Sequence, residues 1–207
     1  MTTAQLTPVT IQNPVVVEVH DELSGPQWCS RFPGSNSTNT LTPEFKASCD
    51  AFIAAIEAAG GHKNISSTYR PPERAYLMHW AHKIYRNGFN PANVPHMNNI
   101  NIEWVHTTHQ ASVEAARKMV YGFGIQILAQ DTPPSLHTLH MERIAIDMSI
   151  SWSGNLCIAK QDGTMVTITT TPRDGMNLQL KEVGRSYGVI KFVGGTQDRP
   201  HWSATGH

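Results

Sequence analysis

The stretch RIAIDMSI, residues 143–150, alternates large apolar side chains with small or polar ones. A period of two predicts a β-strand whose two faces differ. The face toward the core would carry Ile144, Ile146, Met148 and Ile150. The other face would carry Arg143, Ala145, Asp147 and Ser149. The small neighbours on either side of Asp147 leave room beside its carboxylate, so this face is either part of a site or simply exposed to solvent.

Before this strand the sequence favours helices, and after it mostly strands. Helices are expected from Thr42 to the Gly60-Gly61 pair, from Pro71-Pro72 to about Asn87, near Gln110–Tyr121 and near Asn177–Ser186. Further strands are expected at Val15–Val19, Asn64–Thr68, Gly124–Ala129, Asn155–Ala159, Met165–Thr170 and Val189–Val193. The expected fold class is therefore α+β, with an antiparallel β-sheet flanked by helices.

The first 41 residues differ in composition from the rest of the chain. Residues 1–41 are rich in Thr, Pro, Ser, Gly and Asn, which predicts an extended lead-in followed by a loop. We expect this segment to belong to the same domain as residues 42–207, because no repeat, low-complexity tract or linker divides the chain. A length of 207 residues also suits one domain.

Composition excludes several classes of function. The chain has 16 basic and 16 acidic residues, and a net charge of zero disfavours a nucleic-acid-binding protein. No apolar run is long enough to cross a bilayer, and Met1–Val15 lacks the pattern of a secretory signal, so we expect synthesis in the cytosol. Three scattered cysteines do not suggest a disulfide framework. Eleven histidines, by contrast, favour metal binding or proton transfer.

Two histidines can join Asp147 in a metal site. His140 lies seven residues earlier, in a polar segment that predicts a loop able to turn back over the Asp147 face. His201 lies in Asp198-Arg199-Pro200-His201-Trp202, which the proline predicts to be extended or a turn. His, Asp and His are three ligands that zinc accepts, with a fourth position left for water. His137 is an alternative to His140, and either histidine alone could be a solvated loop residue. His79 and His82, and likewise His106 and His109, are three residues apart and could bind a metal, but no obvious carboxylate completes either pair, so we expect them to be surface or cleft-lining residues.

Two further charged residues could take part in chemistry. Asp198 would be a spare carboxylate near the metal, able to take a proton from water and pass it to a leaving amine. Arg70 follows Ser66-Ser67-Thr68-Tyr69 at a strand-to-helix junction, where its guanidinium could bind a carboxylate or stabilise a developing negative charge. Taken singly, each is equally explained as an ordinary turn or helix-start residue.

Together these motifs resemble a known family. The zinc D-Ala-D-Ala carboxypeptidases of the VanY and VanX type, and the related phage L-alanyl-D-glutamate endopeptidases, carry Ser-x-His-x-x-Gly-x-Ala-x-Asp. Residues 138–147, TLHMERIAID, keep the His, Ala and Asp of that motif as His140, Ala145 and Asp147. Thr138 replaces the usual Ser, and Arg143 replaces the usual Gly. The family's Ser-x-x-Arg element is matched by Ser67 and Arg70, and its acid three residues before the last ligand by Asp198.

The resemblance implies a fold like that of the hedgehog signalling domain and one Zn²⁺ ion. It implies metal ligands His140, Asp147 and His201, and catalytic roles for Asp198 and Arg70. It further suggests that substrate is contacted by Ser67, Thr138 and Trp202.

The implied activity is hydrolysis of peptide bonds in peptidoglycan stem peptides, by a carboxypeptidase or an endopeptidase. The chain would be a monomer acting in the periplasm or cell wall, either as a phage lysin or as a secreted antibacterial effector. An effector would have an immunity protein as its partner. The alternative is an inactive zinc-binding or wall-anchoring module on the same fold.

Overall fold

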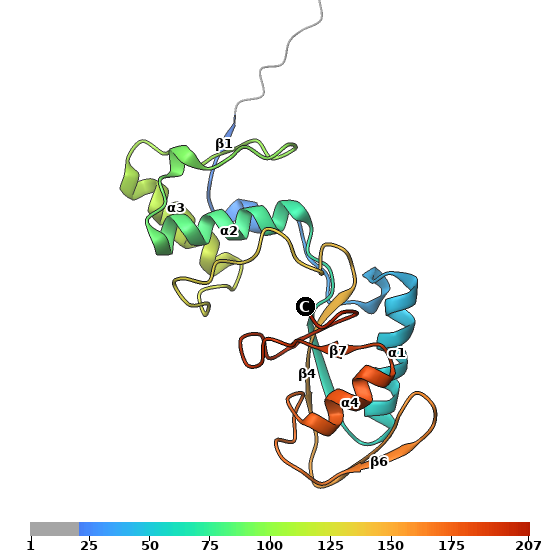
Figure 1. The fold of residues 1–207 in the computed structure, drawn as a ribbon. Helices are drawn as coiled ribbons and strands as arrows, with labels where there is room; N and C mark the ends of the chain where they lie inside the picture. Colours follow the sequence, from blue (N-terminus) through green and yellow to red (C-terminus); the bar gives the residue numbers. More distant parts are fainter. Residues whose placement is uncertain (1–20) are drawn as a thin grey trace, which may run out of the picture.

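A computed structural model describes residues 21–207, and the strand expected at Val15–Val19 lies outside them (Figure 1). The α-helices are α1 (Pro43–Ala58), α2 (Pro72–Asn87), α3 (His109–Gly122) and α4 (Leu178–Ser186). The β-strands are β1 (Glu22–Leu23), β2 (His62–Ser67), β3 (Ile102–Glu103), β4 (Ala145–Ser151), β5 (Leu156–Ala159), β6 (Met165–Ile168), β7 (Ile190–Lys191) and β8 (His201–Ser203). Short 3-10 helices lie at η1 (Pro26–Ser30), η2 (Thr38–Thr40) and η3 (Pro91–Asn93).

The main sheet has four strands in the order β2-β4-β8-β7, and every neighbouring pair is antiparallel. Strands β5 and β6 form a separate antiparallel hairpin, and β1 pairs with β3 in parallel. The mixture of helices with an antiparallel sheet confirms the α+β class. None of the helices among residues 21–207 is long and apolar enough to cross a membrane.

One hydrophobic cluster joins the main sheet to α1 and α4. The core face of β4 contributes Ile146, Met148 and Ile150, all nearly inaccessible to solvent, as the alternation of residues 143–150 predicts. Phe52 of α1 packs against Trp202 of β8, with ring centroids 5.6 Å apart. The sheet is therefore anchored on one face, which leaves the Asp147 face for other contacts.

A second hydrophobic cluster holds α2 and α3 together with η1 and β3. Its large buried side chains include Trp28, Leu77, Trp104 and Met119. Figure 1 shows α2 and α3 side by side and apart from α1, α4 and the main sheet. We call these two parts the helical unit and the sheet unit. The chain passes between the two units at the residues that join η1 to α1, β2 to α2, and α3 to β4.

Local signals explain where the helices begin and end. The Thr42 hydroxyl accepts a hydrogen bond from the backbone N–H of Phe45, which caps α1 as expected. Helix α2 starts at Pro72 and ends at Gly88, whose φ of 64° gives a left-handed cap that glycine adopts without steric cost. All four predicted helices are confirmed to within about two residues at each end.

The strand expected at Gly124–Ala129 is wrong, because this segment is a series of turns. Gly124 has a φ of 73°, and the N–H of Ile125 returns to the carbonyl of Val120 to close the end of α3. Ile125 is then buried, whereas Ile127 is 84% exposed. Two isoleucines at strand spacing thus face different environments, so their apolar character does not reflect a strand.

Candidate metal centre

Three neighbouring strands bring the centre of the candidate site together. Asp147, in the middle strand β4, pairs directly with Ser67 of β2 on one side and with His201 of β8 on the other. Directly paired residues in an antiparallel sheet project to the same face. Ser66, 81 positions before Asp147, donates a hydrogen bond to its backbone carbonyl. His201, 54 positions after Asp147, hydrogen-bonds to its carboxylate. The register of the sheet therefore gathers the site.

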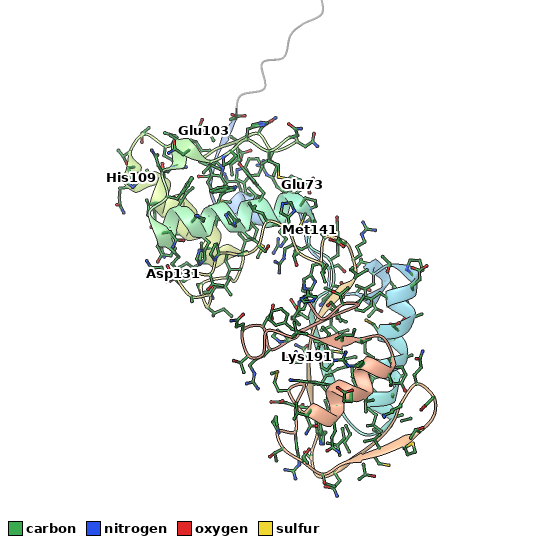
Figure 2. All side chains as sticks on the ribbon, viewed as in Figure 1. Glu73, Glu103, His109, Asp131, Met141 and Lys191 are labelled. Carbon is green, nitrogen blue, oxygen red and sulfur yellow. The ribbon has the colours of Figure 1, made fainter. Side chains whose placement is uncertain are left out.

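His140 reaches the same face from the turn that precedes β4. The N–H of Met141 donates to the carbonyl of Thr138, and the Thr138 hydroxyl accepts from the N–H of His140. This turn directs the His140 ring inward, where it is only 2% exposed. Figure 2 shows Met141, the next residue, near the boundary between the helical unit and the sheet unit.

The two histidines converge on a single carboxylate oxygen. Asp147 Oδ1 lies 3.1 Å from His140 Nε2 and 3.1 Å from His201 Nδ1. The three candidate ligand atoms all lie within 4.8 Å of one another. A four-coordinate ion with bonds of about 2.1 Å requires donor atoms about 3.4 Å apart, so a small adjustment would admit one. His140, Asp147 and His201 could therefore hold a metal ion.

Backbone carbonyls fix which ring nitrogens face the metal position. His140 Nδ1 lies 3.3 Å from the carbonyl oxygen of Thr68, and His201 Nε2 lies 3.0 Å from that of His207. A carbonyl can only accept a hydrogen bond, so these two nitrogens carry the proton. The opposite nitrogens face Asp147 and are the ones that a metal ion would bind in exchange for their contact with the carboxylate. Such carbonyl partners are the usual outer support of metal-binding histidines.

The charges of the triad support one another. Burial alone would raise the pKa of Asp147, but hydrogen bonds from His140 and His201 outweigh it and hold this pKa well below its usual range. Burial alone would lower the pKa of His201, yet its contact with the Asp147 carboxylate raises it overall. The aspartate is thus an anion at neutral pH, which is the form that binds a cation.

Asp198 lies at the edge of the triad, as expected. Its Oδ2 is 3.9 Å from His201 Nδ1, and its side chain is 49% exposed. Partial burial and the nearby negative charge of Asp147 both raise the pKa of Asp198. A carboxylate whose proton affinity is increased, and which water can reach, is suited to accept a proton.

Arg70 also lies where the sequence predicts it. Its backbone N–H donates to the carbonyl of His140 at 3.3 Å. Burial lowers the pKa of its guanidinium, and the charges of Asp147 and Asp198 oppose that effect. Arg70 therefore adds a positive charge close to both acids of the site.

Trp202 is a correction. It was expected to contact substrate, but its side chain is completely buried and its indole N–H donates to the carbonyl of Met148. Strand β8 alternates like any other strand, so His201 faces the metal position and Trp202 faces the core.

The other histidines are placed as follows. His137, the alternative ligand, is exposed and does not belong to the cluster. His79 and His82 were expected to be surface or cleft-lining residues, but His82 is fully buried in the helical unit. His79 is partly buried and hydrogen-bonds to the carbonyl of Pro134 at 2.8 Å. The prediction was therefore wrong for His82, because that ring lies on the inward side of α2.

Arg143 takes a backbone conformation that glycine would take more easily. Its φ is 62°, in the left-handed region, which costs a residue with a side chain roughly 1–2 kcal/mol. The side chain does not enter the metal position, because its guanidinium lies over the ring of Tyr69, 4.6 Å from the centroid. The departure from the family motif at this position is thus compatible with an intact ligand triad.

Lys191 is a residue of the site region that sequence reasoning missed. Its side chain is buried, and its ammonium donates to the carbonyls of Arg199 and His201. It also lies over the Trp202 ring, 4.8 Å from the centroid. Lys191 therefore ties the segment that carries Asp198 and His201 to β7. A lone lysine in a short strand gives no sequence signal for such a contact.

The arrangement brings a possible metal position together with the carboxylate of Asp198, a possible proton acceptor, and the positive charge of Arg70. Two hollows of the described surface lie away from the triad, one beside α4 and β7 and another between α3 and the start of the helical unit. The triad, unlike these hollows, brings together side chains whose donor atoms suit one chemistry, the binding of a cation. Comparison of the chain with protein-family models, with curated proteins and with solved structures found no match.

Proposed function

We propose that the chain is a zinc-dependent peptidase that hydrolyses peptide bonds in the stem peptides of bacterial peptidoglycan. The observation that carries the proposal is the cluster of His140, Asp147 and His201 around one position, with Asp198 at its edge. A metal site that only stabilises a fold is usually closed by four protein ligands, whereas catalytic sites keep a position open. Three candidate ligands with a nearby spare carboxylate fit the second kind.

Zinc is the proposed ion because of the donor set. Two imidazole nitrogens and one carboxylate oxygen suit Zn²⁺, while the absence of thiolate and of several further oxygens makes Cu⁺ or Ca²⁺ a poorer fit. When bound, zinc would polarise a carbonyl and lower the pKa of a water molecule. The ordered carbonyl partners of His140 and His201 would keep both rings in the orientation that binding needs.

Asp198 and Arg70 have complementary proposed roles. Asp198 would accept a proton from the attacking water and return it to the leaving amine, since its pKa is raised and its side chain is half exposed. Arg70 would stabilise negative charge on the attacked carbonyl or hold a substrate carboxylate. Ser67, the neighbour of Asp147 on β2, is a candidate hydrogen-bond partner for substrate.

Peptidoglycan is proposed as the substrate because of the sequence motif. The order of the Arg70 element, the His140–Asp147 pair and the Asp198–His201 pair is that of peptidases acting on stem peptides. The protein would act on the cell wall after release at lysis or after transport by a dedicated secretion system.

The test is release of new amino groups from purified peptidoglycan. The wild-type protein loaded with zinc should release them, and a chelator should stop the release until zinc is returned. Asp198→Asn should lower the rate at least a hundredfold while keeping bound zinc, because it removes only the proton acceptor. Arg185→Gln, an exposed change on α4, is the control that should retain full activity. If the zinc-loaded wild type releases nothing from wall preparations of differing chemistry, the enzyme proposal fails.

A further inference from the structure

Arg143 combines an unfavourable backbone conformation with an exposed charge beside the metal triad. Positive φ values in long side chains are uncommon and concentrate at functional sites. The simplest way to relieve the conformation would be a glycine at this position. The Arg143 side chain is therefore present at some structural cost, and the contacts of its guanidinium show what it could do there.

The fold holds Arg143 close to the proposed ligand His140. The carbonyl oxygen of His140 accepts hydrogen bonds from the N–H of Arg70, at 3.3 Å, and from the N–H of Arg143, at 3.4 Å. The two arginines therefore flank the backbone of a single residue of the triad. Arg143 and Asp147 are four positions apart in the chain, so their Cα atoms are at most about 14 Å apart. That distance corresponds to a few residues of an extended peptide.

The side chain of Arg143 is oriented but not neutralised. The Tyr69 ring supports one face of its guanidinium. Arg143 takes part in none of the ion pairs found among residues 21–207. By comparison, Arg31 in the helical unit lies over Trp28 in the same manner but is also paired with Glu22. An aromatic support leaves the N–H edges of a guanidinium available to a planar anion.

We propose that Arg143, supported by Tyr69, forms a binding subsite for a carboxylate of the substrate, separate from the position of bond cleavage. The inference rests on the proposed function, because stem peptides carry several carboxylates along an extended chain. Arg70 is half-buried and feels the charges of Asp147 and Asp198, whereas Arg143 is exposed. The two cations would thus contact different parts of one bound peptide.

Binding to an inactive protein tests the subsite without turnover. The parent is the zinc-loaded Asp198→Asn protein, and the probes are a synthetic pentapeptide stem with free carboxylates and analogues in which each carboxylate in turn is a carboxamide. Calorimetry should show that one particular amidation weakens binding to the parent about tenfold or more, which is the range of a charge-assisted hydrogen bond. In the same background, Arg143→Gln should bind the free peptide about tenfold more weakly than the parent does. It should bind that amidated analogue as tightly as the parent does.

Two additional variants guard against trivial explanations. Arg143→Gly should lose the same factor, and its backbone suits the left-handed conformation, so misfolding would not account for the loss. Arg31→Gln, which removes another arginine that lies over an aromatic ring, should bind every peptide like the parent. Equal binding of all peptides by the parent and the Arg143 variants overturns the subsite, and so does failure of the parent to bind any of them.

The same experiment separates this inference from the proposed function. If the protein with Asp198 intact hydrolyses none of the peptides but binding still depends on Arg143, the enzyme proposal fails and the subsite stands. If the peptides are hydrolysed but Arg143→Gln leaves KM unchanged on both the free and the amidated peptides, the subsite fails and the enzyme proposal stands.

Discussion

Asp147 and His201 are direct partners in the antiparallel pairing of β4 with β8, and Asp147 Oδ1 lies 3.1 Å from His201 Nδ1. The relationship depends on register, because a slip of one residue would turn either side chain to the opposite face. Trp202 prevents such a slip, since it fills the core on the other side of β8. A core residue thus keeps two candidate metal ligands in contact.

The first prediction concerns metal binding by the triad. The wild-type protein should bind one zinc ion, and at a free zinc concentration of about 100 Kd the ion should stabilise the fold by about 2.7 kcal/mol. His140→Ala, Asp147→Ala and His201→Ala should each remove most of this stabilisation. Zinc content by mass spectrometry and thermal unfolding with and without a chelator provide the measurements.

The matched control for these variants is His137→Ala. His137 is exposed and lies outside the cluster, so its removal should change neither zinc content nor the stabilisation. Loss of zinc in His137→Ala together with its retention in His140→Ala would show that the ligand assignment is wrong.

The second prediction concerns Lys191, which holds the segment leading to His201. Lys191→Met keeps a long apolar side chain but removes the donor to the carbonyl of Arg199 and one of two donors to that of His201, which also accepts from the N–H of Phe192. A hydrogen bond from a charged donor contributes about 1.5–3 kcal/mol, so the loss of the two ammonium contacts should lower the free energy of unfolding by at least 1 kcal/mol. Zinc affinity should fall as well, because His201 loses its backbone support.

Denaturant unfolding of the metal-free protein and zinc titration measure these two effects separately. Lys118→Met is the control, since Lys118 is exposed on α3 and its replacement should alter neither quantity. A Lys191→Met protein as stable as the wild type, with equal zinc affinity, would contradict the proposed support.

The helices could be predicted from sequence because their signals are local, and the cluster of candidate metal ligands because its spacing resembles a known motif. Thr42 before Pro43 marks the start of α1, and Gly88 after Asn87 marks the end of α2. Both signals lie in neighbouring residues of the chain. The alternation of residues 143–150 likewise identifies a strand and its core face without knowledge of its partners. His140 required only a loop that could turn back toward Asp147.

The errors arise where structure depends on distant parts of the chain. Strand β8 spans only three residues, too few to show alternation, and its pairing with β4 gives it strand character. Without that strand, Trp202 was assigned to the wrong face. His82 was expected near the surface because the apolar residues of α3 that bury α2 lie about thirty positions later in the sequence. The sign of φ at Arg143 is set by a turn closed through His140.

The third prediction concerns the pH dependence of stability through His82. Neither ring nitrogen has a hydrogen-bond partner among the described residues. Burial lowers the pKa of His82; the nearby backbone of Ala129 opposes this effect only in part, and the positive charge of Arg86 adds to it. The unfolded chain therefore binds the proton more readily, so this contribution to stability is present above about pH 6.5 and is lost as the pH falls through the folded-state pKa.

Replacement by an apolar residue of similar size isolates that contribution. His82→Leu should be as stable as the wild type or more stable at pH 7.5, because it removes two unpaired buried nitrogens. Its advantage over the wild type should grow at pH 5, as measured by urea unfolding at both values. His96→Leu, at an exposed position, is the control. An advantage that shrinks as the pH falls would mean that His82 is charged in the folded protein.

The fourth prediction distinguishes the cysteines by their reactivity. Cys49 is completely buried in α1, and burial raises the pKa of its thiol to about 12, so on the order of one molecule in ten thousand carries the reactive thiolate at pH 8. Cys157 is exposed on β5. Brief treatment with iodoacetamide at pH 8 should therefore modify Cys157 and leave Cys49 unmodified until urea unfolds the protein, as peptide mass spectrometry would show. Equal rates at both residues in the folded protein would contradict the packing of α1 against the sheet.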